Sequence, residues 1–554
     1  MKKILSKTSF AEIILILSVI CSGAFYEYLS CFLSAAMLVW LTVKAVREKK
    51  LKFNLSLTGA AAAAVAGAYL ISFIWAVDRG MAVIGFLKFL PVLLYIFVLM
   101  QDEKREGIIS HLPYIAAAVT VVSVAGMFIP AFSSFFSVAG RLAGTFQYPN
   151  TFALFLLVCE ITVLSKEKLS ALNIVTLLIL LFGIFYTGSR TVFVLALVSN
   201  AVMVFALKKK PVKIALISAL GTAVAGAVIY ALVTGGGGAF GRLFNISFTQ
   251  STFVGRFLYF KDALPSILKH PFGTGYLGYY YTQKSYQTGV YSVMFIHNDF
   301  LQILLDVGWL PFAAFAAAVV RSVAVKGRPF YQRVIICVIA LHCCFDFDLQ
   351  FICMFMLLVL FMGYGGKEKT IKRGSVIAVM SGVFAAVNLY TGTALLLSRA
   401  GLYGASQKML PFNTQNEINL LTNEQDLDRA EQIADDILSR NGSVIIAYNV
   451  KAKNAYSKGV YGDVIKYKNR IFELAPFEYQ EYEEYCRMLI KGIELYTAKG
   501  SEKSAAICAD ELIKAADAVH ALPEKQSRLG KMIKDQPNTA LPEEIEAYVK
   551  ELKE

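Results

Sequence analysis

The sequence predicts an all-α membrane protein, with a polytopic transmembrane bundle of about 12–13 spans over residues 1–397 and a helical domain over residues 399–554. Of the 554 residues, 56% are hydrophobic and only 17% are charged, whereas soluble domains carry roughly 25% charged residues. Apolar stretches long enough to cross a hydrocarbon core of roughly 30 Å recur up to residue 397. The charge balance then changes: residues 1–397 hold 33 basic and 15 acidic residues, and the rest hold 21 and 25.

Thirteen apolar segments fit this first region, and we expect each to form a helix. The eleventh and twelfth are short and flank Asp346 and Asp348, so they form either a tight hairpin or a partly re-entrant element. The segments are 9–25, 27–44, 55–77, 81–100, 109–130, 150–165, 169–187, 191–207, 213–234, 299–320, 334–346, 350–364 and 374–397.

The basic residues give the orientation of these spans. With the N-terminus in the cytoplasm, the inside segments carry 24 basic residues and the outside loops carry few, as the positive-inside rule requires. The positive charge therefore indicates topology, and we expect a lipid bilayer and no nucleic acid as partner. Thirteen spans place the polar tail outside the membrane, whereas one miscounted span would move it to the cytoplasm.

Seven of the nine cysteines lie in or beside apolar segments and show no metal-binding spacing, which is typical of small buried hydrophobic residues. Cys486 and Cys508 lie in the polar tail, where they either pair or stay as thiols.

Two segments depart from the regular pattern of spans. Residues 235–297 form a predicted extracytoplasmic loop that is rich in Tyr, Phe and Gly, and a loop of this length usually carries function. The tail reads as consecutive amphipathic helices, and residues 454–476 resemble a tetratricopeptide repeat, with Gly459 at the turn and Pro476 at the end. Such repeats stack on neighbours. We expect either a platform for a protein or glycan partner, or a lid that packs on the membrane domain.

Four polar stretches lie at predicted outer helix ends, where ionisable groups are costly. GRLAGTFQYPN contains Arg141 and Asn150, which alone predict a turn and a helix start. YTGSR ends in Arg190, which either binds an anionic ligand or reaches to the membrane interface. An amphipathic stretch contains Arg256, whose planar fork suits a diphosphate. FIHNDFLQILLDVGWL places His297 at the mouth of a span.

The order of these motifs, SR, then R followed by HPFGTGYLG, then HN leading into FLQILLDVG, resembles the O-antigen ligase and Wzy-type polymerase family over roughly residues 60–350. The resemblance implies an all-helical, inverting GT-C-like glycosyltransferase of the bacterial cytoplasmic (inner) membrane. Its donor would be a glycan on undecaprenyl diphosphate. Arg190 and Arg256 would hold the diphosphate and His297 would assist the acceptor hydroxyl. Further matching positions are Arg141, Asn150, Asn298 and Asp346.

Elementary chemistry agrees with these roles. Two guanidinium groups can stabilise the charge that develops on a departing diphosphate, and an imidazole can take the hydroxyl proton near neutral pH. We recognise no acidic pair or metal-ligand cluster in the outer loops, so we expect no metal and no cofactor. The hypothesis requires Arg190, Arg256 and His297 to share one outward-facing pocket.

Several alternatives stay open at this point. Ligase and polymerase share these motifs, and the acceptor is a glycan, a lipid or a protein. We favour the ligase because the tail could present an acceptor. A polysaccharide transporter or flippase would instead show paired charges or broken helices inside the membrane. A scaffold that holds assembly partners gives no reason for this order of arginines and histidine.

Overall fold

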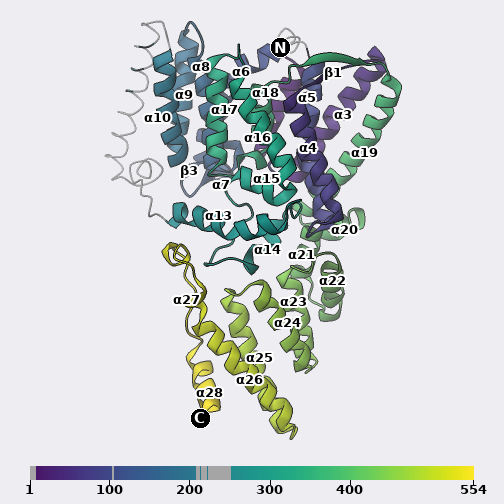
Figure 1. Cartoon of the computed structure of the whole chain (residues 1–554), viewed down its shortest axis with the longest axis vertical. Helices are drawn as coiled ribbons and strands as arrows, with labels where there is room; N and C mark the ends of the chain where they lie inside the picture. The colour runs from purple at the N-terminus through teal and green to yellow at the C-terminus, as the bar shows by residue number, and fades with distance from the viewer. Residues whose placement is uncertain (1–7, 103–104, 207–212, 214–216, 218–220, 222–250) are drawn as a thin grey trace.

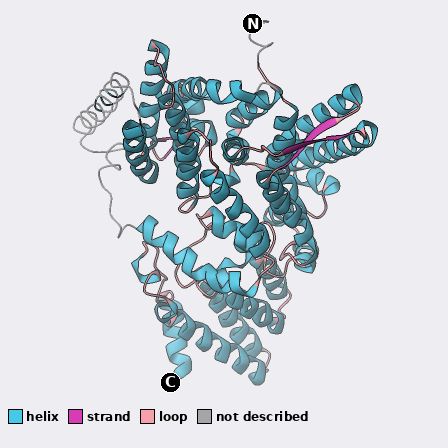
Figure 2. Cartoon of the chain, turned by 45° about the horizontal axis from the view of Figure 1, so that its top comes forward, coloured by secondary structure: helices cyan, strands magenta, loops and turns pink. Residues whose placement is uncertain are grey.

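In the computed structural model, residues 8–102, 105–206, 213, 217, 221 and 251–554 are described. Figure 1 shows a bundle of helices and, beyond one of its ends, a smaller helical domain formed by the tail. The all-α prediction is confirmed, because the described strands form only two short two-stranded sheets. One of them, β1 (Leu51–Leu55) with β4 (Lys367–Ile371), lies at the end of the bundle opposite the tail (Figures 1 and 2). The other pairs β2 (Ser137–Val138) with β3 (Arg141–Leu142).

The bundle surrounds a continuous apolar core. Several of its helices begin at capping side chains that accept a hydrogen bond from the first turn, among them Ser9, Ser56 and Asp78. Its helices are α2 (Phe10–Ile20), α3 (Glu27–Glu48), α4 (Leu57–Ile71), α5 (Arg79–Gln101), α6 (Arg105–Met127), α7 (Pro130–Phe136), α8 (Pro149–Leu164), α9 (Ala171–Thr187), α10 (Arg190–Ala206), α13 (Ser251–Lys269), α14 (Gly278–Thr282), α15 (Asp299–Val307), α16 (Trp309–Ala324), α17 (Phe330–Cys343), α18 (Ile352–Met362) and α19 (Gly374–Arg399).

Among the described residues, five helices are both long and apolar enough to cross a membrane: α3, α4 with the turn after it, α5, α6 and α19. Seven further apolar helices have 10–17 residues. Most predicted spans therefore correspond to helices, although many are shorter than a single full crossing requires. The predicted span 213–234 and the start of the predicted loop, 235–250, lie outside the described residues.

The prediction of one continuous span over residues 299–320 is wrong. The chain breaks at Gly308, which separates α15 from α16 and has φ +83°. A side chain there would lie 2.3 Å from the carbonyl oxygen of Pro271, so only glycine fits the bend. The bend lets Thr274 and Gly275 donate to the carbonyl oxygens at the end of α15. The segment after α13 is thereby joined to the bundle.

The tail forms helical hairpins in the predicted region. The segment 454–476 spans the end of α23 (Ile445–Ser457), a turn at Gly459 and α24 (Tyr461–Leu474). It is flanked by α22 (Leu427–Arg440) and by the pair α25 (Tyr479–Ala498) and α26 (Glu502–His520). Its assignment as a tetratricopeptide repeat stays a prediction. The remaining tail helices are α20 (Tyr403–Met409), α21 (Thr414–Asn423), α27 (Leu522–Lys525) and α28 (Glu543–Lys553).

All nine cysteines are free. Cys486 and Cys508, the two that might have paired, are both buried in the apolar core of the tail, so they act as small hydrophobic residues.

Candidate active site

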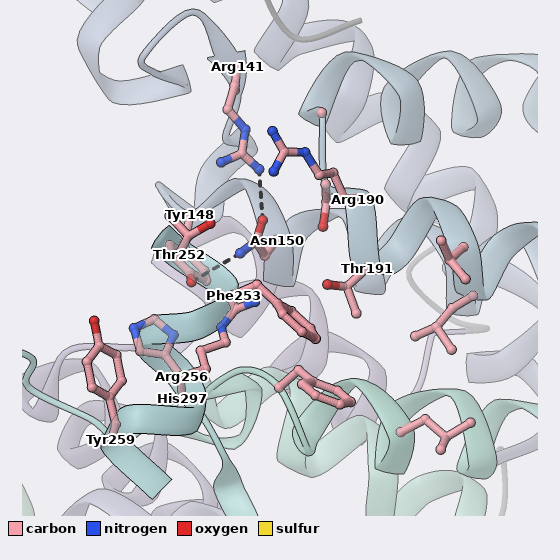
Figure 3. A pocket seen from close by; sticks show the side chains of 16 residues that line it. Arg141, Tyr148, Asn150, Arg190, Thr191, Thr252, Phe253, Arg256, Tyr259 and His297 are labelled. Atoms are coloured by element: carbon pink, nitrogen blue, oxygen red, sulfur yellow. Dashed lines mark hydrogen bonds between the residues drawn. The ribbon is translucent and has the colours of Figure 1, made fainter. Parts of the chain in front are cut away.

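A cavity of about 580 Å³ lies between α8, α10, α13 and the end of α17. Figure 3 shows Arg141 and Arg190 together at one end of it, and His297 and Tyr259 at the other, with Arg256 beside His297. The three side chains on which the sequence hypothesis depends therefore face one space. The lining residues are Arg141, Tyr148, Asn150, Gly188, Ser189, Arg190, Thr191, Val194, Leu195, Thr252, Phe253, Arg256, Tyr259, His297, Leu341 and Phe345.

Short turns between helices place the polar groups at this cavity. Helix α9 ends at Gly188 in the left-handed conformation, and Arg190 is the first residue of α10. Asn150 is the second residue of α8, directly after Pro149, which is well suited to a first helical turn. Arg256 lies in the first half of α13. Arg190 and Arg256 are thus held on helices rather than on loops.

His297 lies in a loop and has φ +57°, a left-handed backbone conformation that costs energy for a residue with a side chain. The next residue, Asn298, begins α15: its Oδ1 accepts from the N–H of Leu301 at 3.0 Å, and its Nδ2 donates to the carbonyl of Cys344 at 3.0 Å. Asn298 does not line the cavity. It holds the His297 loop against the turn that follows α17.

That turn carries Asp346, which connects both sides of the cavity. Its carboxylate accepts from Asn150 Nδ2 and the Tyr148 hydroxyl, each at 2.8 Å. It also pairs with Arg256 Nη2 and His297 Nδ1, each at 3.2 Å. The side chain of Asp346 is only 1% exposed, whereas those of Arg256 and His297 are 17% and 22% exposed. Asp346 is therefore a buried anchor behind two groups that still face the cavity.

Asp346 is ionised at neutral pH. Burial alone would raise the pKa of its carboxyl, but the charge of Arg256 and the hydrogen bond from His297 together lower that pKa below its usual range. An ionised carboxylate only accepts hydrogen bonds, so Nδ1 of His297 carries the proton. The Nε2 of a neutral His297 is then left with a lone pair that can accept a proton.

Arg141 is anchored by the protein itself. Its Nε donates to the carbonyl of Thr187 at 2.7 Å, and its Nη2 donates to Asn150 Oδ1 at 2.8 Å. These bonds join the turn before α8 to the end of α9. Arg141 therefore fixes Asn150, which in turn binds Asp346, besides lining the cavity.

Sequence reasoning missed several residues of this site. Tyr148 and Tyr259 line it, and Thr252, Phe253 and Phe345 complete the wall. Tyr148 lies inside a stretch that had been selected for Arg141 and Asn150, so its position was a usable signal. The aromatic residues of α13 carry no pattern that separates a cavity wall from a packing face.

Asp346 and Asp348 lie in the turn after α17 and are separated by one residue, so they form an acidic pair. Asp299, Cys343 and Asp348 are buried, and their potential metal-binding atoms lie within 4.8 Å of one another. Protein groups already bind both carboxylates: Asp348 pairs with His342 and Thr151, and Asp299 accepts from the N–H of Leu349. None of the three lines the cavity, so a metal held there would not touch the space between the arginines and His297.

Comparison with known protein families gives one match. Residues 175–316 match the family model described as O-antigen ligase. The chain contains an O-antigen ligase domain. The match includes Arg190, Arg256, His297 and Asn298, while Arg141, Asn150 and Asp346 come from flanking parts of the bundle. A search of curated proteins found no match.

The predicted family membership is confirmed over this domain. Together with the apolar helices, the O-antigen ligase domain identifies a membrane protein whose function is of the O-antigen ligase or polymerase type.

Proposed function

We propose that this protein is a glycosyltransferase that moves a glycan from an undecaprenyl-diphosphate carrier to an acceptor hydroxyl at the outer face of the cytoplasmic membrane. One observation carries the proposal: Arg190, Arg256 and His297 line the same cavity, and His297 Nδ1 rests on the buried carboxylate of Asp346. The undecaprenyl-diphosphate donor is the one that the family resemblance implies, and the roles of the residues toward donor and acceptor are inferred from their chemistry.

The arginines suit the leaving diphosphate. When the bond between the anomeric carbon and the diphosphate oxygen breaks, negative charge builds up on that oxygen, and guanidinium groups placed beforehand stabilise it. Arg190 also begins α10, where the partial positive charge of the helix start adds to its own. Arg256 donates one N–H to Asp346 and still faces the cavity. The negative charge on the leaving diphosphate would thus be neutralised by Arg190 and Arg256.

His297 suits the acceptor. As the acceptor oxygen forms its bond to the anomeric carbon, its proton passes to Nε2 of His297, and the diphosphate leaves with the bonding electron pair. The resulting imidazolium is stabilised by Asp346 at 3.2 Å. His297 and Arg190 lie at opposite ends of the cavity, with Arg256 beside His297 (Figure 3). The inverting attack that we propose therefore requires the anomeric carbon to lie between His297 Nε2 and a diphosphate held at Arg190.

The cavity also offers a path for the lipid. Val194 and Leu195 of α10 line it beside Arg190, and the side chain of Val194 is 45% exposed on the outside of the bundle. Apolar residues continue along that helix, with Leu197 and Val198 50% and 57% exposed. In a bilayer this face would meet lipid, so a polyprenyl chain could lie along α10 with its diphosphate at Arg190.

The tail lies beyond α13, at the end of the bundle opposite β1 and β4 (Figure 1). If the cavity opens outside the cytoplasm, as glycan assembly requires, the tail lies outside as well. This placement does not depend on counting spans. The tail is then available to an acceptor or to a protein partner.

A transporter is the alternative with an observation in its favour, because the bundle contains a buried ion pair and a broken helix. Lys88 pairs with Glu27 at 3.5 Å and donates to the Tyr276 hydroxyl at 3.0 Å, and α15 breaks from α16 at Gly308. These groups do not line the cavity that Arg190, Arg256 and His297 share. They tie the segment after α13 to the bundle, which favours a structural role.

The test uses the purified full-length chain with lipid-linked glycan extracted from its host. Glycosyl transfer predicts release of undecaprenyl diphosphate in the presence of EDTA, together with a glycosylated acceptor from host membranes. Movement of intact donor across vesicles without release would contradict the proposal and support a transporter. In a deletion strain, loss of attached glycan with normal chain length indicates a ligase, whereas single-repeat chains indicate a polymerase.

A further inference from the structure

The C-terminal domain contacts the catalytic half of the bundle through side chains, such as Gln415 with the Tyr281 hydroxyl and Glu478 with Lys284, and through two close backbone fits. Near the start of α5, Asn441 donates to Asp78 at 3.1 Å, and Gly80 lies so close to the tail that a side chain there would be 1.9 Å from the carbonyl oxygen of Phe412. The second contact is formed by residues 526–533, which lie after α26 and pack on the segment that leads to His297. We call this second contact the clamp.

The clamp is a close backbone fit. The N–H of Ser527 donates to the carbonyl of Thr288 at 2.9 Å, and the two hydroxyl oxygens are hydrogen-bonded at 2.8 Å. Gly530 lies directly over this contact: a side chain there would be 2.1 Å from the Thr288 carbonyl oxygen and 3.1 Å from Gly289. A substitution at Gly530 must therefore push the two segments apart.

From Thr288 the contacts run to α13. The Thr288 N–H and hydroxyl each donate to the carboxylate of Asp262 at 2.7 Å, and the Tyr291 hydroxyl donates to the same carboxylate at 3.1 Å. Asp262 is buried and lies on the helix that carries Arg256. Thr288 thus joins the clamp to two other parts of the site: the segment that leads to His297, and α13, which carries Arg256.

An apolar cluster completes the connection. Ile533 of the tail packs with Val254, Leu258 and Tyr291, and Tyr259 packs against the same cluster. The Tyr259 ring lies 4.5 Å from that of Tyr291 and 6.3 Å from that of His297, measured between centroids. Tyr259 itself lines the cavity. The tail therefore supports the histidine end of the cavity, whereas the arginine end is built by α8, α9 and α10.

We propose that the C-terminal domain is a working part of the transferase site, in which Ser527, Gly530, Thr288 and Asp262 are positioning residues that set His297 against Arg256. The proposal rests on the proposed function, and it replaces the idea of the tail as a separate recruitment module with that of a built-in support for acceptor activation. The reaction tolerates little displacement of a catalytic group, so loosening the clamp slows transfer, while Arg190 at the other end of the cavity still holds the donor diphosphate.

Two matched pairs of variants in the full chain test this proposal. Thr288→Val removes the hydroxyl at nearly constant size, while Thr288→Ser keeps it. Gly530→Ala introduces the clash, while Gly462→Ala places the same methyl group on α24, where no atom lies within 4 Å. The first readout is transfer in cells, as the ratio of attached to lipid-linked glycan. The second is binding of undecaprenyl diphosphate to the purified chain, and the third is amide hydrogen exchange.

We expect Thr288→Val and Gly530→Ala to lower the glycan ratio at least about tenfold, with undecaprenyl diphosphate binding within about twofold of the parent chain. Hydrogen exchange should rise over residues 286–297 and stay unchanged at the start of α10, while the two partner variants behave as the parent chain. Unchanged exchange over 286–297, or equal loss of binding and transfer, would overturn the proposal. Normal attached glycan in a deletion strain would instead overturn the proposed function.

Discussion

The two ends of the cavity are built in different ways. The arginine end consists of helix starts: Arg190 begins α10, Asn150 lies in the first turn of α8, and Arg141 is bonded to the end of α9. The histidine end depends on a loop, in which His297 has a left-handed backbone and is held from outside by Asp346, Asn298 and the clamp. Donor binding at Arg190 therefore depends on the bundle alone, whereas acceptor activation depends on contacts from distant parts of the chain.

Apart from the loss of His297 itself, the largest effect is expected for the arginines. Arg190→Ala should weaken binding of undecaprenyl diphosphate and slow transfer by about 100- to 1,000-fold, because a preorganised charge on the leaving group is lost. Arg256→Lys keeps the charge but removes the planar fork that faces both Asp346 and the cavity, so it should also reduce transfer. Donor binding by isothermal titration, measured beside the transfer rate, checks both. If Arg190→Ala bound undecaprenyl diphosphate with the affinity of the parent chain, the assignment of donor binding to the arginine end would be contradicted.

A smaller effect is expected for Asp346→Asn. The pKa of Asp346 lies below its ordinary value, so its ionised contacts stabilise the fold fully above pH of about 4 and are lost only as the pH falls through the lowered pKa. The amide cannot orient and stabilise an imidazolium in the same way, and we expect transfer to fall by about 10- to 100-fold. Because the amide of the variant cannot ionise, raising the pH from 6 to 9 should not restore transfer. Recovery at high pH would contradict this role for the carboxylate.

The smallest effect is expected for Asn298→Ala. The variant loses the cap of α15 and the contact to Cys344, which should lower the free energy of unfolding by about 1 kcal/mol. Transfer should fall only as far as the His297 loop loosens. Thermal melting in detergent measures the loss of stability, and the transfer rate measures the loss of activity. A loss of transfer as large as that of Arg190→Ala would show that Asn298 acts on the substrate directly.

The sequence predicted more of the arginine end than of the histidine end. Motif order alone brought out Arg190, Arg256 and His297, and hydropathy located most bundle helices. Hydropathy failed at Gly308, because an apolar run does not reveal a bend that depends on a positive φ. The clamp could not be predicted from the sequence, since Thr288 and Ser527 are 239 residues apart and both are ordinary polar residues. Asp346 was identified only by resemblance, and its four side-chain partners appear only in the fold.

The central claim is that His297 activates the acceptor while the arginines hold the donor, and one paired measurement tests it most directly. In His297→Ala the transfer rate should fall by about 100- to 10,000-fold, as expected for loss of a general base, while the affinity for undecaprenyl diphosphate stays within about twofold. The same assay on Arg190→Ala should show weakened affinity. Transfer at the parent rate in a folded His297→Ala chain would contradict the account.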